Sequence, residues 1–413
     1  EVKEVSAKYS HTGYKQTEVG LIPSDWTTVS LENAAVNGGL VRGPFGGALK
    51  KEFFVDRGYK VYEQRNAIYE TVEIGDYFIE LSKFKELDRF SVRPGDFIVS
   101  CSGTIGCIFQ IPHGAPAGVI NQALLKISLN TKNIDERFFL AIFRSKSFQE
   151  RIKENSHGGA MQNLVGMDVF RKTLFQLPPT KAEQEAIAEA LSDADALIES
   201  LEQLLAKKRH LKQGAMQQLL TGKKRLPGFS GEWEVKQLGE IAEIVMGQSP
   251  SSAHYNNKGD GLPLIQGNAD ISNRKTIMRV FTTEITKRGR CGDILMSVRA
   301  PVGEISLAVF DVCLGRGVCA IRYPNEFLYH ALIAKESTWT KLSKGSTFDS
   351  VNSTDVKVFG IELPNDDAEQ TAIVTILSDM DAELVALEAE LAKARRLKQG
   401  MMQELLTGRI RLV

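Results

Sequence analysis

The stretch LKQGAMQQLLTGKKRL at residues 211–226 returns almost unchanged as LKQGMMQELLTGRIRL at residues 397–412. These two phrases end longer copies, because residues 177–226 align with residues 363–412 without a gap and are identical at 30 of 50 positions. A repeat of this length and identity indicates an internal tandem duplication. The chain is therefore expected to consist of two similar halves.

Each repeated segment is predicted to form one long helix. Apolar residues recur at alternating spacings of four and three, which is the heptad pattern of a coiled-coil seam. They are Ile187, Leu191, Ala194, Ile198, Leu201 and Leu205 in the first copy, and Ile373, Leu377, Met380, Leu384, Leu387 and Leu391 in the second. Gly222 and Gly408 follow as signals that end each helix. A helix of about 40 residues would be about 60 Å long, which is more than a single domain core needs.

Charge is unevenly distributed along each copy, with acidic residues in the first half and basic residues in the second. Part of this distribution suits the dipole of a helix. Parallel pairing of the two helices would also place acid beside acid, whereas antiparallel pairing places each acidic half beside a basic half. The pattern therefore predicts an antiparallel two-helix coiled coil within one chain. The alternative is a pair of amphipathic helices packed into ordinary domain cores.

The segments before the two helices are more distantly related to each other. PGDFIVSCSGTIG at 94–106 matches CGDILMSVRAPVG at 291–303, and both segments contain short β-type runs broken by Gly and Pro. The predicted fold class is α+β, with two globular α+β domains joined by two long antiparallel coiled-coil helices in a pseudo-two-fold repeat. The predicted boundaries are 1–176 for the first domain, 177–226 for the central helix, 227–362 for the second domain and 363–413 for the C-terminal helix.

Composition excludes several classes of protein. The 413 residues are 43% apolar and 25% charged, and no apolar run approaches the length of a membrane span. The five cysteines form no CxxC pair, which favours a reduced, cytoplasmic protein without a zinc site. The net charge of zero counts against a strongly basic nucleic-acid binder but does not exclude a local basic patch. The sequence also lacks the GxxxxGK[ST], HExxH and GxSxG motifs, so no catalytic site is expected.

Taken together, these motifs resemble the specificity (S) subunit of Type I restriction–modification enzymes. GYKQTEVGLIPSDW at 13–26 is similar to the opening of that family. RGPFGGALK at 42–50 and MGQSPSSAHYN at 246–256 are similar to the early segments of its two target recognition domains. LPPTKAEQEAIAEAL and the two LKQG phrases are similar to its central and distal repeat regions. The resemblance covers nearly the whole chain.

The resemblance implies a non-catalytic protein that binds double-stranded DNA. Each globular domain would read one half of a bipartite site, and the helices would set the spacer between the halves. Two methyltransferase (M) subunits would bring S-adenosylmethionine, and restriction (R) subunits would bring ATP and magnesium, so no cofactor is expected on this chain. Two alternatives are a scaffold that pairs two proteins through its coiled coil, and an enzyme with an unrecognised site.

Base edges are read by Arg, Lys, Asn, Gln, Ser and Thr side chains on exposed loops. In the first domain the candidates are Arg42, Lys50, Gln64, Arg65, Asn66, Ser102, Thr104, Asn121, Gln122 and Gln162. In the second domain they are Gln248, Tyr255, Gln266, Asn268, Arg299, Arg316, Lys344, Ser346 and Thr347. Phosphate contacts, which position a protein without specifying sequence, are expected from Lys50, Lys51, Lys83, Lys85, Lys341 and Lys344.

The repeated phrase itself is interpreted as a repeated surface for the two M subunits, because two equal partners need two equal docking sites. The candidate residues are Gly214, Met216, Leu219, Leu220, Gly400, Met402, Leu405 and Leu406. The alternative for these positions is packing within the chain itself.

Overall fold

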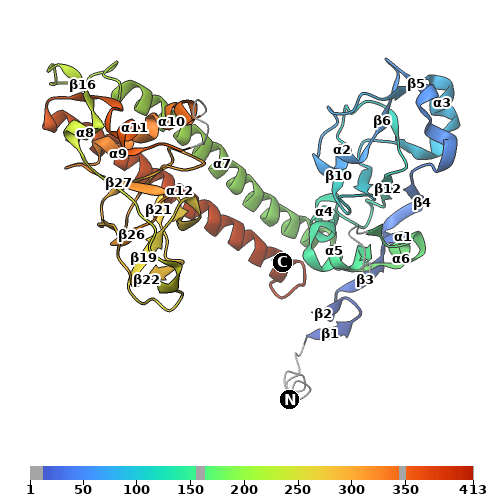
Figure 1. Cartoon of the computed structure of the whole chain (residues 1–413). Helices are drawn as coiled ribbons and strands as arrows, with labels where there is room; N and C mark the ends of the chain where they lie inside the picture. Colours follow the sequence, from blue (N-terminus) through green and yellow to red (C-terminus); the bar gives the residue numbers. More distant parts are fainter. Residues whose placement is uncertain (1–12, 155–162, 344–349, 413) are drawn as a thin grey trace. The chain divides into compact units, whose positions relative to one another are not determined.

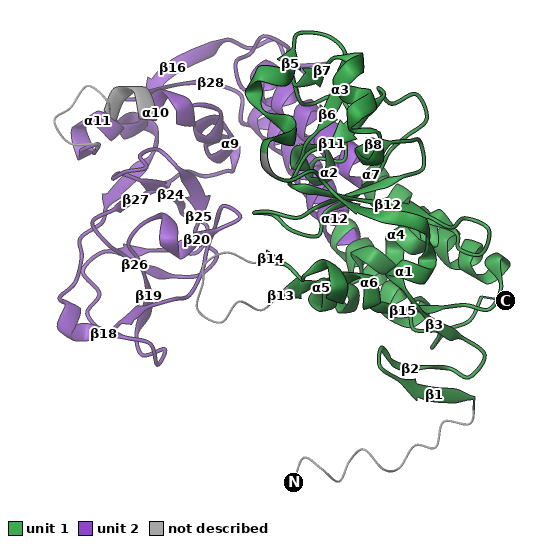
Figure 2. Cartoon of the chain, turned by 90° about the vertical axis from the view of Figure 1, so that its right-hand side faces the viewer, with its two compact units in different colours: residues 1–200, 391–413 green, residues 201–390 purple. Residues whose placement is uncertain are grey.

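A computed structural model of the chain describes residues 13–154, 163–343 and 350–412. The chain divides into two compact units, unit 1 with residues 1–200 and 391–413 and unit 2 with residues 201–390 (Figure 2). Each unit contains one globular domain, the first part of the long helix that follows it and the last part of the other long helix. The duplication of the sequence is thus also a duplication of structural units.

The domain of unit 1 is built on two β-sheets. One is antiparallel in the order β10-β9-β12-β4. The other has the order β5-β7-β6-β11-β8, in which β6 and β11 run parallel. The strands are β4 (Ala35–Arg42), β5 (Phe54–Val55), β6 (Tyr59–Tyr62), β7 (Phe78–Ile79), β8 (Ser91–Val92), β9 (Phe97–Ser100), β10 (Ile108–Gln110), β11 (Gly118–Ile120) and β12 (Leu124–Leu129).

Short helices and strand pairs complete this domain. They are α1 (Leu31–Ala34), α2 (Gln64–Ile68), α3 (Leu81–Glu86), α4 (Glu136–Arg144), α5 (Lys146–Ile152) and α6 (Met167–Lys172), with the pairs β1 (Tyr14–Thr17) and β2 (Gly20–Pro23), β3 (Thr27–Ser30) and β15 (Leu174–Leu177), and β13 (Lys153–Glu154) and β14 (Asn163–Leu164). Asp135 caps the start of α4, since its carboxylate accepts the N–H groups of Arg137 and Phe138. Buried aromatic side chains fill the core of the unit: Trp26, Phe97, Phe138, Phe139, Phe143, Phe148, Phe170 and Phe175. Burial of such a side chain contributes roughly 1.5–3 kcal/mol relative to its exposure.

The domain of unit 2 repeats this plan with a larger first sheet. Its sheets have the orders β17-β27-β24-β25-β21-β20 and β18-β22-β19-β26-β23, and β19 and β26 run parallel as β6 and β11 do. The strands are β17 (Glu243–Met246), β18 (Tyr255–Asn256), β19 (Leu262–Ile265), β20 (Ile271–Ser272), β21 (Lys275–Thr276), β22 (Phe281–Thr282), β23 (Arg288–Gly289), β24 (Ile294–Ser297), β25 (Ile305–Leu307), β26 (Val312–Leu314) and β27 (Val318–Arg322). The pair β16 (Trp233–Gln237) and β28 (Gly360–Pro364) and the helices α8 (Leu238–Ile241), α9 (Phe327–Ala334), α10 (Glu336–Ser343) and α11 (Ser353–Lys357) complete it.

The two long helices are α7 (Lys181–Leu219) and α12 (Asp367–Leu405), drawn in green and in red in Figure 1. They lie inside the predicted ranges 177–226 and 363–413, and their 39 residues each correspond to about 60 Å. All twelve residues of the predicted seam are buried or half-buried. Gly222 and Gly408 end the helices with φ of +64° and +69°, which glycine adopts without the steric cost of a side chain.

Candidate nucleic-acid interface and helix pair

In unit 1, loops that follow four strands are held together at one end of the two sheets. The N–H of Gly43, after β4, donates to the carbonyl of Leu124 at 2.8 Å. The N–H of Asn121, after β11, donates to the carbonyl of Tyr62 at the end of β6 at 2.9 Å. The N–H of Cys101, after β9, donates to the carbonyl of Ala123 at 2.8 Å. These backbone bonds bring together the loops that carry most of the predicted base-reading residues of the first domain.

The predicted residues of this domain differ in exposure. Ser102, Thr104, Gln122, Lys50 and Arg65 are exposed, and Arg42, Gln64 and Asn121 are half-buried. Within the described part of the chain, Nε of Arg42 and Oε1 of Gln64 are buried without a hydrogen-bond partner. Buried polar atoms normally find a partner, so these two atoms are unsatisfied within the described chain.

Two of the predicted side chains in this domain are already engaged. Arg65 pairs with Glu63 at 3.0 Å. Asn66 is fully buried, since its Oδ1 accepts the N–H of Glu63 and its Nδ2 donates to the carbonyls of Thr71 and Ile74. The prediction that Asn66 reads a base is therefore corrected, because its amide holds the turn after β6.

In unit 2, five of the predicted residues line one cavity of about 660 Å³: Tyr255, Gln266, Asn268, Arg299 and Arg316. The cavity lies where β19, β24 and β26 end, which corresponds to the strand ends of unit 1. Gln248 is exposed beside it, and its N–H donates to the carbonyl of Leu314 at 2.9 Å.

Sequence reasoning missed two residues of this cavity. Asp270 is buried and its Oδ2 accepts the N–H of Gln266 at 2.8 Å, so it does for this turn what Asn66 does in unit 1. Arg279 donates to Oδ1 of Asp270 at 3.2 Å and to the carbonyl of Ala269 at 2.8 Å. The run QGNAD contains Asp270, but nothing in the run distinguishes a buried turn carboxylate from an exposed one.

Several predicted residues lie outside the described part of the chain, namely Gln162, Lys344, Ser346 and Thr347. The side chain of Lys341 is also outside it. Of the remaining predicted phosphate-binding lysines, Lys51 and Lys85 are exposed, while Lys50 lies 3.7 Å from Glu52 and Lys83 lies 2.8 Å from Glu86. Binding of phosphate by these four described lysines stays a prediction.

The long helices are joined by ion pairs that occur twice. In unit 1, Lys398 of α12 pairs with Asp195 of α7, and in unit 2, Lys212 of α7 pairs with Asp381 of α12. The partners in the two pairs differ by 186 positions each (381 − 195 and 398 − 212), so they are the same pair in two copies. In each unit the acidic start of one helix lies beside the basic end of the other, which confirms the predicted antiparallel pairing.

A second duplicated pair ties each domain to the helix ends. Glu183 is 1% exposed and accepts from Arg411, and Glu369 is 1% exposed and accepts from Arg225 at 2.6 Å and 2.7 Å. Arg411 also lies 5.7 Å from the centre of the Trp26 ring, as Arg225 lies 5.9 Å from that of Trp233. Hydrogen bonds to Asp25 and then to Glu183 raise the pKa of Arg411, so its guanidinium stays charged.

The residues predicted to dock M subunits are mostly covered by the chain itself. Met216, Leu219 and Leu220 are buried in the core of unit 2, and Leu405 and Leu406 are buried in the core of unit 1. Gly214, Gly400 and Met402 are half-buried. The prediction that the five buried side chains contact a partner is corrected, because they anchor each domain to the helix ends. The alternative of packing within the chain holds at these positions.

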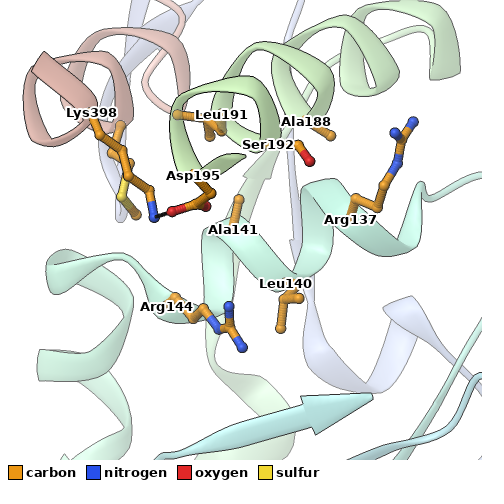
Figure 3. A pocket seen from close by; sticks show the side chains of 10 residues that line it. Arg137, Leu140, Ala141, Arg144, Ala188, Leu191, Ser192, Asp195 and Lys398 are labelled. Carbon is orange, nitrogen blue, oxygen red and sulfur yellow. Dashed lines mark hydrogen bonds and ion pairs between the residues drawn. The ribbon is translucent and has the colours of Figure 1, made fainter. Parts of the chain in front are cut away.

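A cleft of about 410 Å³ in unit 1 lies between α4, α7 and α12. Figure 3 shows Arg137 and Arg144 projecting from α4 on either side of Ala141, opposite the Asp195–Lys398 pair. Arg144 pairs with Glu70 at 2.7 Å. The cleft therefore combines charged rims with an apolar floor of Leu140, Ala141 and Leu191.

Helix α9 of unit 2 corresponds to α4, and it carries a buried histidine. Asn325 accepts the N–H of Phe327 as Asp135 accepts that of Arg137, which places His330 at the position of Leu140. His330 is 1% exposed, and in the described part of the chain neither ring nitrogen has a hydrogen-bond partner. Burial, followed by the charge of Lys212, lowers the pKa of His330 to about 4.

Among the described residues, no group of three or more His, Cys, Asp or Glu side chains could hold a metal ion, and no helix is long and apolar enough to cross a membrane. Two domains that present clustered polar loops, fixed to an antiparallel helix pair by duplicated contacts, define a two-site recognition protein. The family model "Type I restriction modification DNA specificity domain" matches residues 46–207 and 230–394. The chain belongs to this family, and its function is DNA sequence recognition in a Type I restriction–modification system.

Individual relatives agree with this assignment. The chain is 28% identical to the MjaX specificity subunit of Methanocaldococcus jannaschii over 98% of both chains, and 23% identical to the MjaVIII specificity subunit of the same organism over 98% of this chain and 97% of that one. It resembles a chain from a structural study of assembly and conformational transition in the type I R-M system (TM-score 0.62, 23% identity, 94% and 99% coverage). It also resembles the HsdS subunit from Thermoanaerobacter tengcongensis (TM-score 0.52, 24% identity, 94% and 98% coverage). These two structural likenesses support the fold.

Proposed function

We propose that each domain of this chain reads one half of a bipartite site in double-stranded DNA, and that the helix pair sets the spacer between the halves. The observation that carries this proposal is the duplication of contacts. The Asp195–Lys398 and Asp381–Lys212 pairs occur in the same place in each unit. The loops at the strand ends of the two domains differ in chemistry, which two different half-sites require.

The same duplication supports two equal docking sites for two M subunits. Two equivalent sites, one at each end of the helix pair, bind two copies of the same subunit. Since Leu219, Leu220, Leu405 and Leu406 are buried, docking on these helices uses the exposed faces instead. Leu211 and its counterpart Leu397 are exposed large apolar residues on those faces, at 49% and 59%.

The chain itself performs no chemistry in this proposal. S-adenosylmethionine is bound by the M subunits, and ATP and magnesium by R subunits where these are present. The chain contributes position, since each domain holds its half-site at a fixed place relative to a docked M subunit.

The experiment is reconstitution of the full chain with its M subunit. Native mass spectrometry is expected to find two M subunits per chain, and methyl transfer to DNA is expected only when both proteins are present. Methyl transfer by the chain alone, or a complex with a single M subunit at saturation, would contradict the proposal. Sequence-independent binding of DNA by the complex would favour the alternative of a protein scaffold.

A further inference from the structure

The guanidinium groups of two arginines at the cavity of unit 2 have no partner within the described part of the chain. Arg299 follows β24 and Arg316 follows β26, and both are exposed. Other arginines of the same domain are neutralised by carboxylates: Arg274 by Glu336, Arg279 by Asp270, Arg288 by Asp311 and Arg322 by Asp293 and Glu243. Because the guanidinium groups of Arg299 and Arg316 are not paired with a carboxylate, they are available to a ligand.

The backbone on both sides of these arginines is fixed. The N–H of Arg316 donates to Oγ of Ser249 at 3.2 Å, and the N–H of Gly315 donates to the carbonyl of Ile265 at 2.8 Å. The N–H of Val298 donates to the carbonyl of Gly317 at 2.9 Å, so the loop of Arg299 is bonded to the loop of Arg316. A side chain at Gly317 would overlap the carbonyl oxygen of Gln266. The two guanidinium groups therefore project from one prearranged piece of backbone.

Their neighbours are polar and ordered. Nε2 of Gln266 donates to the hydroxyl of Tyr255 at 3.1 Å, and that hydroxyl donates to the carbonyl of Pro250 at 3.2 Å. Asn268 lines the same cavity. Among the described residues of the lining, the only carboxylate is that of Asp270, which is buried and bonded to Arg279 and so does not neutralise either unpaired arginine.

The first domain has different chemistry at the matching positions. Ser102 follows β9 as Arg299 follows β24, and Gln122 follows β11 as Arg316 follows β26. Both are exposed and uncharged. The two domains thus offer different groups on the same framework.

We propose that Arg299 and Arg316 read guanine in the half-site of the second domain, and that the first domain makes no arginine contact at these two positions. The proposal rests on the proposed function of DNA recognition and names the base that unit 2 selects. The planar fork of a guanidinium matches O6 and N7 of guanine in the major groove, where it forms two parallel hydrogen bonds. A hydroxyl or an amide at the same place does not form that pair, and an amide favours adenine instead.

Contact with phosphate is the competing role for an unpaired arginine. Phosphate contacts position a protein without selecting bases, so they weaken binding to all sequences alike. The fixed backbone and the polar cavity around Arg299 and Arg316 favour base contact, because base reading depends on exact placement of the donor groups.

The test compares Arg299→Gln and Arg316→Gln with the natural chain, each in complex with the M subunit. Binding sites are selected from randomised duplex DNA and measured at several salt concentrations. Each substitution is expected to reduce the preference for guanine at one position of one half-site by about 10-fold to 100-fold, which is the range for loss of one bidentate base contact. The other half-site is expected to stay unchanged.

Arg290→Gln is the matched control, because Arg290 is exposed and precedes β24, at the end of the strand away from Arg299. It is expected to leave the selected sites unchanged. Uniform weakening with all preferences retained and a smaller salt slope would overturn the proposal in favour of phosphate contact. A natural half-site for the second domain without guanine would also overturn it. If the natural chain in its complex selects no sequence, the proposed function itself fails, which is a distinct result.

Discussion

Replacement of His330 by leucine is expected to stabilise unit 2, and by more at acidic pH. The imidazole is buried with both ring nitrogens unpartnered in the described chain, and the corresponding residue of unit 1 is Leu140. Removal of an unsatisfied buried polar group is worth about 1–3 kcal/mol at neutral pH. Unit 1 has leucine at the corresponding position, where its side chain is half-buried.

The pH dependence follows from the lowered pKa. In the folded chain the pKa of His330 is about 4, against an ordinary value of 6.5. Above pH 6.5 the imidazole is neutral in both the folded and the unfolded state. As pH falls from 6.5 to 4, the unfolded state binds a proton that the folded state does not bind. Stability is therefore lost over this window, by up to about 3 kcal/mol, and about 2 kcal/mol of it is lost by pH 5. His330→Leu removes this loss.

The assay is hydrogen exchange of peptides from unit 2, with denaturant unfolding as a second measure, at pH 7 and pH 5. The advantage of His330→Leu over the natural chain is expected to increase by about 2 kcal/mol between the two pH values. Peptides of α4 in unit 1 serve as an internal control, and His113→Gln, which changes an exposed histidine, is expected to have no effect. An advantage that does not depend on pH, or a less stable variant at pH 7, would refute the reasoning.

Three further predictions concern the duplicated contacts. Arg411→Met leaves the buried Glu183 without its partner, so unfolding of unit 1 is expected to become easier by about 2 kcal/mol, and Arg225→Met is expected to do the same to unit 2; equal effects on both units in either variant would contradict this. The double variant, in which the charges of Asp195 and Lys398 are exchanged, is expected to keep its complex with M. The single variant Asp195→Lys is expected to lower the stability of unit 1. Equal stability of the single and double variants in thermal unfolding would count against the ion pair. An insertion of four residues after Ala206, together with another four after its counterpart Ala392, is expected to lengthen each helix by about 6 Å and the spacer by one or two base pairs. Methylated sites with the original spacing would exclude the helices as the element that sets the spacer length.

The insertion must be made in both helices because of the structure. Lys212 pairs with Asp381 after position 206 of α7, and Asp195 pairs with Lys398 before it, so an insertion in α7 alone could not retain both pairs. An insertion at position 206 alone would therefore test disruption of the coiled coil as well as the spacer.

The architecture was accessible from the sequence because duplication and periodicity are global signals. The heptad seam and the polarised charge together predict long antiparallel helices, and the Asp195–Lys398 and Asp381–Lys212 pairs are their direct consequence. Exposed loop positions such as Ser102 and Gln122 were also accessible, since they follow short apolar runs.

Individual side chains were less accessible, because a residue type does not reveal its partners. Asn66 in the YEQRNAI stretch has the chemistry of a base reader, yet its amide is used up by the backbone of its own turn. Leu219 and Leu405 were predicted to contact a partner subunit, but each is buried in a core formed by the domain and the other long helix of the same unit. A heptad pattern predicts that one face of a helix is buried, but it does not identify the segment that buries it.

The measurement that tests the central claim most directly is an exchange of the first domain, followed by mapping of methylated sites. Residues 31–172 are replaced by the corresponding segment of a related specificity subunit, which leaves the β3–β15 pair at the helix junction intact. One half of the bipartite site is expected to change, while the other half and the spacer length stay the same. A change in both halves, or in neither, would contradict the claim that each domain reads its own half-site.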